Sequence, residues 1–264
     1  MKIPPRPLPF VLVATEQGTL LVNRLDYRMI DEKRGFGVGH EIFNNGSFDS
    51  QEINLAQRLL IMLRETRGDN IFALDCGANI GVHTISWSRL MTGWGQALAI
   101  EAQERIFYAL AGNICINNLF NAKAINVAVG SEDGFINVPS LDYCRSASFG
   151  SLELIKRTSE YIGQEVKYDT DLQQIRLVAI DSLNLHRLDF VKMDIEGMEI
   201  SALEGAKNTL IKFRPVMIIE KIKSDNAALI ELMRSIKYHT VNFGLNILAL
   251  PEEDLINSRI KISE

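Results

Sequence analysis

The sequence predicts an α/β fold in which a mostly parallel sheet is covered by helices on both faces. From Ile71 onward, short and almost continuously apolar runs alternate with segments of helical periodicity, the pattern expected when parallel strands are joined by helices. The chain has 264 residues, of which 47% are hydrophobic, so it can bury a sizeable core without support from disulfides or metals.

Residues 1–69 are predicted to form an N-terminal β/α cap that consists of a β-hairpin, a loop and a helix. The runs VLVAT (11–15) and TLLVN (19–23) have β-like composition and flank a turn that contains glycine. The Gly- and Asn-rich stretch 35–48 is predicted to be a loop. An amphipathic helix follows, whose apolar positions are Leu55, Leu59, Leu60 and Leu63.

Residues 70–264 are predicted to form the larger domain, with strands too short to be helices and bounded by turn or charged residues. The expected parallel strands are 71–75, 96–101, 123–129, 188–194 and 215–220. The expected helices are Val82–Leu90, Arg105–Leu119, Glu199–Lys212 and Asn226–Ser235. The runs 238–243 and 246–251 are predicted to close one edge as an antiparallel pair, whereas 139–174 is a polar insertion without a clear strand.

Charge and composition narrow the possible partners. The chain has 28 Lys and Arg against 33 Asp and Glu, a net charge of −5, which argues against nucleic acid as a partner. The sequence contains no run of about 18 apolar residues, the length that a membrane-spanning helix needs, so no integral membrane association is predicted. Three widely spaced cysteines, an odd number, fit neither a disulfide framework nor a zinc site and indicate a cytoplasmic protein.

The stretch FALDCGANIG (72–81) is the most informative motif. A buried strand ends at Asp75, and Gly77 and Gly81 frame the turn into the next helix, where glycine lets the backbone approach a ligand closely. The spacing D-x-G-x-x-x-G lacks the third glycine of the dinucleotide-binding fingerprint. A carboxylate before the first glycine repels a pyrophosphate but suits S-adenosylmethionine, which carries a sulfonium and an ammonium group.

A second acid, Glu101, ends the next strand. Neighbouring parallel strands bring Asp75 and Glu101 to the same edge of the sheet, where open α/β folds bind ligands. There Glu101 is expected to accept hydrogen bonds from the ribose hydroxyls of the methyl donor. The alternative, that Asp75 caps a helix and Glu101 is merely exposed, explains each acid singly but not their combination.

Between about Gly46 and Glu220 the sequence resembles the FkbM-type S-adenosylmethionine-dependent methyltransferases. The motifs that carry the resemblance are DCGANIG (75–81), IEAQ (100–103), Asn113 with Asn117, AVGSEDG (128–134), FVKMDIEGMEISALEGA (190–206) and RPVMIIE (214–220). The resemblance implies a class I methyltransferase (Rossmann-like) fold with seven strands, and methyl transfer to oxygen, often a sugar or polyketide hydroxyl. Two positions depart from the family pattern, because Ala102 replaces a proline and His83 stands where an aromatic residue is common.

Four charged residues at the ends of two later strands are the predicted catalytic group. Asp194 and Glu196 follow one strand, Glu220 ends the next, and Lys192 shares a strand face with Asp194. Such carboxylates can accept the proton of a substrate hydroxyl or hold a divalent cation, which is possible but not predicted. In the insertion, Tyr143, Arg145 and Ser148 are candidates for acceptor binding, and the roles of His40 and His83 stay open.

The sequence therefore predicts an S-adenosylmethionine-dependent O-methyltransferase that acts on a hydroxyl of a small molecule or glycan. The alternatives are a nicotinamide-dependent oxidoreductase and a non-catalytic subunit that binds the donor. The apolar N-terminal strands are a candidate interface for a homo-oligomer. Donor binding is assigned to Asp75, Gly77, Asn79, Gly81, Glu101, Ala102, Ala128 and Asp194.

Overall fold

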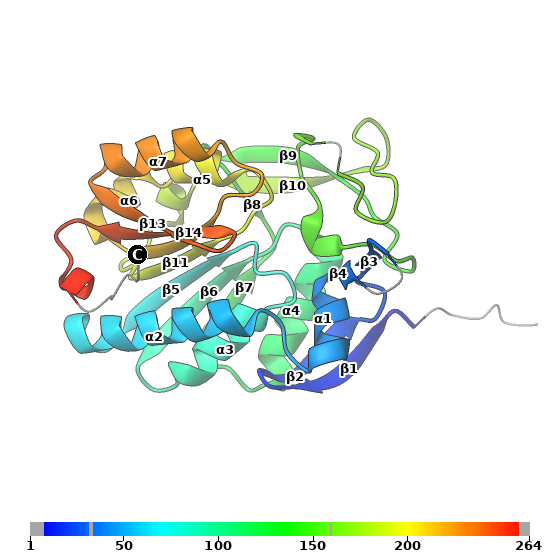
Figure 1. Ribbon diagram of the computed structural model, residues 1–264, viewed down its shortest axis with the longest axis horizontal. Coiled ribbons are helices and arrows are strands. Elements are labelled where there is room, and N and C mark those ends of the chain that lie inside the picture. The colour runs from blue at the N-terminus through cyan, green and yellow to red at the C-terminus, as the bar shows by residue number, and fades with distance from the viewer. Residues whose placement is uncertain (1–7, 32–33, 159, 259–264) are drawn as a thin grey trace, which may run out of the picture.

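The computed structural model describes residues 8–31, 34–158 and 160–258, so the outermost residues of the two predicted parts lie outside the described chain. The main sheet consists of β5 (Ile71–Cys76), β6 (Gly95–Ile100), β7 (Ala122–Ile125), β11 (Phe190–Met193), β12 (Val216–Glu220), β13 (Tyr238–Phe243) and β14 (Asn246–Pro251). Its seven strands have the order β13-β14-β12-β11-β5-β6-β7 (Figure 1). From β12 to β7 the neighbours are parallel, and β14 pairs antiparallel with both β12 and β13. The predicted fold class is confirmed.

Helices cover both faces of this sheet, as the apolar strands require. One face carries α2 (Ser50–Arg67), α3 (Val82–Leu90) and α4 (Glu104–Ile116), and the other α5 (Glu199–Glu204), α6 (Lys207–Phe213) and α7 (Asn226–Ser235) (Figure 1). Successive strand residues face opposite sides: Ala73 packs with the α2 and α3 side chains, and Leu74 packs with those of α5 to α7.

The prediction of a single helix over 199–212 is wrong, because the structure has two helices there, α5 and α6. Gly205 separates the two helices, and its backbone passes so close to the carbonyl oxygen of Gly130 that a Cβ would overlap it. This contact between distant parts of the chain overrides the continuous helical pattern.

The N-terminal region contains more regular structure than the sequence predicts. The hairpin of β1 (Phe10–Thr15) and β2 (Gly18–Asn23) is followed by β3 (Arg28–Met29), β4 (Gly35–Phe36) and α1 (Val38–Asn45). The loop predicted over 35–48 is therefore wrong in part. Val38 and Ile42 are one helical turn apart and bury their side chains, whereas Gly37 and Gly46 flank the helix.

Two asparagine side chains attach the hairpin to the main domain. Asn113 of α4 accepts a hydrogen bond from the Leu21 nitrogen at 2.5 Å and donates one to the Ile80 oxygen at 2.8 Å. Asn117 likewise bonds both main-chain groups of Thr19. These bonds give Asn113 and Asn117 a structural role in the molecule.

A second sheet, in the order β8-β10-β9, stands beside the main one. It consists of β8 (Ala128–Val129), β9 (Gly134–Pro139) and β10 (Leu172–Val178). The single strand predicted over 123–129 is wrong, because Asn126 donates hydrogen bonds to the carbonyls of Glu101 and Ala102, and the chain leaves the main sheet there. The described residues also form three 3-10 helices: η1 (Phe149–Ser151), η2 (Ile180–Leu183) and η3 (Leu255–Ser258).

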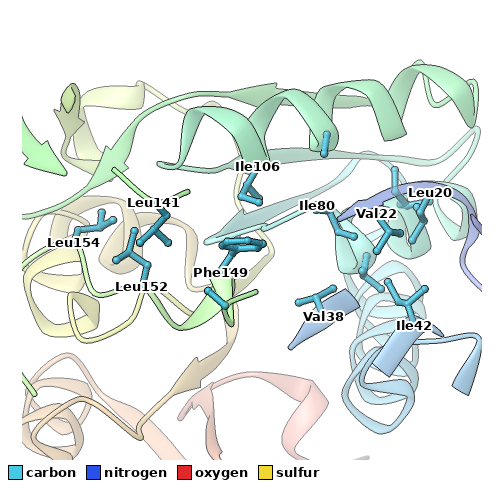
Figure 2. Close-up of a cluster of buried hydrophobic side chains, with 14 of the residues drawn as sticks. Leu20, Val22, Val38, Ile42, Ile80, Ile106, Leu141, Phe149, Leu152 and Leu154 are labelled. Atoms are coloured by element: carbon cyan, nitrogen blue, oxygen red, sulfur yellow. The ribbon is translucent and has the colours of Figure 1, made fainter. Parts of the chain in front are cut away.

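The insertion joins β9 to β10, an antiparallel pair in which Pro139 lies opposite Leu172. Strand β10 therefore begins inside the stretch predicted to lack strands. Figure 2 shows how the insertion is held: Phe149 lies beside Ile106, with Leu152 on one side and Val38 on the other. One buried cluster thus connects the insertion, α1 and the hairpin to the main domain. No helix in the described part of the chain is long and apolar enough to cross a membrane.

Candidate active site

A cavity of about 480 Å³ opens at the carboxyl ends of β5, β6, β11 and β12. It is lined by residues in the last positions of these strands and in the turns that follow them, together with Val38 and Glu41 of α1. The insertion contributes its 148–154 segment and Glu160. The cavity therefore lies where parallel α/β sheets bind ligands, with a wall built from the N-terminal region and the insertion.

Asp75 lies in the middle of the row of strand ends that line the cavity, because β5 lies between β11 and β6. Its side chain is 1% exposed, and it accepts a hydrogen bond from the Thr84 hydroxyl at 2.5 Å. Burial raises the pKa of Asp75, while the nearby Lys192 ammonium and the Thr84 bond oppose that rise. Asp75 is thus a buried acid whose partners favour its charge.

Glu101 follows β6, at one end of this row of strands, and is held by the main chain. Its two oxygens accept hydrogen bonds from the Asn79 nitrogen at 2.9 Å and the Gln103 nitrogen at 2.8 Å. Burial raises the pKa of Glu101 to about 7, against the effect of these N–H groups. The carboxylate is therefore fixed in orientation beside the apolar Ala102 and Ala128, which also line the cavity.

The two glycines of the motif have different surroundings. Gly77 lines the cavity at φ 80°, and a Cβ there would overlap the carbonyl oxygen of Asp194. Gly81, at φ 91°, precedes α3 and packs on Leu110. Gly77 thus permits two strand ends to approach each other, and Gly81 permits α3 to approach α4.

The end of the cavity beside β11 and β12 is charged, and it begins at Lys192, which lies opposite Asp75 in the pairing of β11 with β5. The Lys192 ammonium lies 2.9 Å from Oδ2 of Asp194 and 3.7 Å from Oε1 of Glu52. Burial alone would lower the pKa of Lys192. The carboxylates of Asp194, Glu52 and Asp75 outweigh burial and raise that pKa above its ordinary value, so Lys192 is a cation.

Glu199 shapes the turn that carries Glu196. Oε1 of Glu199 accepts hydrogen bonds from the nitrogens of Ile195 and Gly197, at 3.0 and 3.2 Å, and Oε2 accepts one from Ser224. Glu196 itself adopts φ 55°, in the left-handed region. Because Glu199 is 1% exposed and bonded on both oxygens, it acts as a structural clamp under the turn.

Asp194, Glu196 and Glu220 offer oxygen atoms that lie within 4.8 Å of one another. Burial and the charge of Asp194 raise the pKa of Glu196 to about 8 and that of Glu220 to about 10. Such an oxygen set suits a hard divalent cation. A second set, Asp49 with Glu52 and His83, is equally close, and an ammonium group lies beside both sets, since Lys192 is 2.9 Å from Asp194 and 3.7 Å from Glu52.

Lys223 joins the insertion to this charged end. Its ammonium lies 2.6 Å from Glu196 and 3.2 Å from Glu160, and it donates a hydrogen bond to the Ser151 carbonyl at 3.0 Å. The side chain is 7% exposed. A single buried cation therefore fixes the insertion against the turn that follows β11.

The structure brings most of the predicted site residues to one cavity. Those that line it are Asp75, Gly77, Asn79, Glu101, Ala102, Ala128, Lys192, Asp194, Glu196 and Glu220. Gly81 is not among the lining residues. Of the insertion candidates Ser148 lines the cavity, whereas Arg145 is exposed and Tyr143 donates a hydrogen bond to Gln103. His83 lines it, and His40 lies outside it beside Asn44.

Sequence reasoning missed Glu52, Lys223 and the cavity-lining Gln103. For Glu52 a weak signal existed, because it falls on the helical stripe that continues through Ala56, Leu59 and Leu63, although it also lies in the first turn of α2, where an acid is favoured. Lys223 and Gln103 carry no comparable local signal.

The donor set fits S-adenosylmethionine. An oriented, buried carboxylate beside apolar walls suits a ribose diol next to a flat base, and an acid-rich cavity suits a cationic ligand. The imidazole of His83 adds two buried nitrogens that no described residue engages in a hydrogen bond. They are available to a bound molecule.

Comparisons with known proteins agree with this arrangement. The family model of the FkbM methyltransferase domain matches residues 75–240. The methyltransferase sdnD of Sordaria araneosa is 24% identical over 204 residues, which cover 69% of this chain and 73% of sdnD.

Solved structures are more distant. A methyltransferase FkbM from Methylobacillus flagellatus KT is 19% identical with a TM-score of 0.48, over 69% of this chain and 44% of that one. A tRNA (uracil-54, C5)-methyltransferase from Pyrococcus abyssi, in complex with S-adenosyl-L-homocysteine, is 11% identical with a TM-score of 0.46. The match covers 92% of this chain and 44% of that one. This chain therefore spans less than half the length of either structure.

Proposed function

This chain belongs to the FkbM methyltransferase family, and we propose that it transfers a methyl group from S-adenosylmethionine to a hydroxyl oxygen of a small molecule or glycan. The observation that carries the proposal is one continuous cavity with the oriented Glu101 carboxylate at one end and Asp194, Glu196 and Glu220 at the other. A donor and an acceptor can meet within such a space.

The residues divide into two groups by their position in the cavity. Asp75, Gly77, Asn79, Glu101, Ala102 and Ala128 are assigned to the donor, with Glu101 oriented toward the ribose hydroxyls. When bound, S-adenosylmethionine supplies an electrophilic methyl group attached to a sulfonium. Asp194, which is 35% exposed, faces the region left for the acceptor.

In the proposed reaction the acceptor oxygen forms a bond to the methyl carbon while the carbon–sulfur bond breaks. The hydroxyl proton passes to Asp194, which acts as the base. Lys192 holds Asp194 in place through the 2.9 Å ion pair. Glu220, whose pKa is raised to about 10, carries a proton at neutral pH and donates a hydrogen bond to another oxygen of the acceptor, whereas Glu196 stays paired with the Lys223 ammonium.

Two further properties are proposed with the activity. The free cysteines, Cys76, Cys115 and Cys144, support a reducing compartment such as the cytoplasm. Neither nucleic acid nor a membrane is invoked as a partner, in keeping with the net charge of −5 and the cavity-bound acceptor. Homo-oligomer formation stays a prediction.

Calorimetry with S-adenosylhomocysteine tests the donor site, and an NADH titration run beside it tests the oxidoreductase alternative. We expect saturable binding of S-adenosylhomocysteine and none of NADH. The opposite pattern would reject the methyltransferase assignment of this cavity.

Radiolabelled S-adenosylmethionine incubated with a panel of methyl glycosides tests transfer. Incorporation into a sugar, lost in the matching deoxy sugar, identifies an oxygen acceptor. Asp194→Asn should abolish incorporation while donor affinity changes less than about twofold. Full incorporation by this variant would remove Asp194 from the mechanism, and donor binding without transfer to any hydroxylated acceptor would favour the non-catalytic alternative.

A further inference from the structure

We propose that Glu52 and Asn246 form a positioning pair that fixes the Lys192 ammonium beside Asp194. The inference rests on the proposed function, because it concerns the residue that holds the base. Glu52 lies on α2 and Asn246 begins β14, so both lie outside the segment 75–240 that matches the family model. The pair completes the site from outside that segment.

The contacts form a chain with a defined direction. The side-chain nitrogen of Asn246 donates a hydrogen bond to Oε2 of Glu52 at 2.5 Å. The other oxygen, Oε1, lies 3.7 Å from the Lys192 ammonium, which in turn bonds Asp194 at 2.9 Å. Asn246 therefore holds one oxygen of Glu52 and leaves the other facing Lys192.

Burial makes this pairing a strong constraint. Glu52 is 4% exposed and the Lys192 side chain 6%. No described residue donates a hydrogen bond to Oε1 of Glu52, and burial raises the pKa of Glu52 to about 7 against the attraction of Lys192. When Glu52 is ionised, Lys192 is therefore its main compensation for the loss of water. His83 also faces this oxygen at 3.7 Å, but burial lowers the pKa of His83 well below its ordinary value, so the ring is neutral.

Glu52 lies in the first turn of α2, where the helix dipole favours an acid, but its side chain is buried on the otherwise apolar stripe of that helix. The buried acid lies 3.7 Å from the Lys192 ammonium while Asp194 contacts the same ammonium at 2.9 Å, so two carboxylates hold Lys192 at once. Asp194 is 35% exposed, and without Glu52 the ammonium is free to follow it toward solvent.

Lysine ammonium signals in proton–nitrogen NMR spectra of the full chain labelled with ¹⁵N-lysine report this contact directly. The Lys192 signal is assigned by its loss in Lys192→Met. Glu52→Gln keeps the size of the side chain and removes its charge, so we expect the Lys192 signal to shift or to broaden beyond detection. The matched control is Glu65→Gln, the same change at an exposed position of the same helix, which should leave the signal in place.

A second variant keeps the proposal falsifiable if Glu52→Gln does not fold. Asn246→Ala releases Oε2 of Glu52 and should shift the same signal by a smaller amount. An unchanged Lys192 signal in the folded variants would overturn the positioning pair. Calorimetry of the unmodified protein with S-adenosylhomocysteine is a separate measurement: failure there rejects the proposed function, whereas failure of the NMR test rejects only the pair.

Discussion

Substitution of Gly77 by alanine tests the closest backbone approach in the site. Gly77 has φ 80° and would place a Cβ on the carbonyl oxygen of Asp194. Gly93 is a matched control, because it has φ 86° and no heavy atom within 4 Å of the position of its Cβ. Both substitutions strain the backbone similarly, and only one creates a collision.

The expected magnitudes follow from these two environments. A left-handed conformation costs alanine about 1–2 kcal/mol, which is the whole effect expected for Gly93→Ala. In Gly77→Ala the Asp194 carbonyl must also retreat by about 1 Å or more to restore an ordinary contact, and such overpacking costs about 1–3 kcal/mol. Gly77→Ala should therefore lose about 2–5 kcal/mol of unfolding free energy.

Urea unfolding followed by tryptophan fluorescence measures both variants against the unmodified protein. Thermal unfolding is a second measurement, because each kcal/mol of lost unfolding free energy lowers the Tm of a chain of this size by about 2–4 °C. Because Gly77 and Asp194 both line the cavity, the same variant should bind S-adenosylhomocysteine at least about tenfold more weakly. Equal destabilisation by the two substitutions would refute the close approach of β5 and β11 at this point.

Three further outcomes are expected. Glu101→Gln should weaken S-adenosylhomocysteine binding about 10- to 100-fold in calorimetry, since hydrogen bonds to a charged group contribute about 1.5–3 kcal/mol, whereas Glu104→Gln, outside the cavity, should not. Burial raises the pKa of Asp26 to about 7, so the folded state keeps a proton that the unfolded chain releases, and stability falls as pH rises toward 7. The unmodified protein should therefore lose unfolding free energy between pH 5 and pH 8, and Asp26→Asn should lose about 2–3 kcal/mol less over the same range, as measured by urea titrations. An identical pH profile for the two proteins would contradict the raised pKa of Asp26. Thermolysin should cleave the insertion, residues 140–171, several-fold faster in Lys223→Met than in the control Lys221→Met, because Lys223 contacts the insertion whereas Lys221 contacts Asn242. Equal rates of cleavage would show that Lys223 does not hold the insertion.

The sequence predicted the parts of the site that are encoded locally. Asp75 and Glu101 each follow an apolar strand, and parallel pairing alone brings two such strand ends together. The same logic places Asp194 beside Glu220, because β11 and β12 are parallel neighbours. These predictions required only the order of strands, turns and helices along the chain.

Contacts between distant segments were beyond the reach of such reasoning. Glu52 meets Lys192 and Asn246 only after α2 and β14 have packed on the sheet. The strand predicted through Asn126 fails for a similar reason, since its side chain binds carbonyls that follow β6. In both cases the local pattern is intact, and a long-range polar contact decides the structure.

The direct pairing of Pro139 with Leu172 has a consequence for how this enzyme can diversify. The chain departs from the second sheet and returns to it at the same place, so residues 140–171 form an excursion whose two ends are already joined. Loop-closure entropy grows only with the logarithm of length, and doubling such an excursion costs about 0.6 kcal/mol. Evolution or a protein engineer can therefore change the length of this wall of the cavity at small entropic cost, as long as Phe149, Leu152 and Leu154 stay in the buried cluster, while Asp75 and Glu101 keep their supports in the main domain.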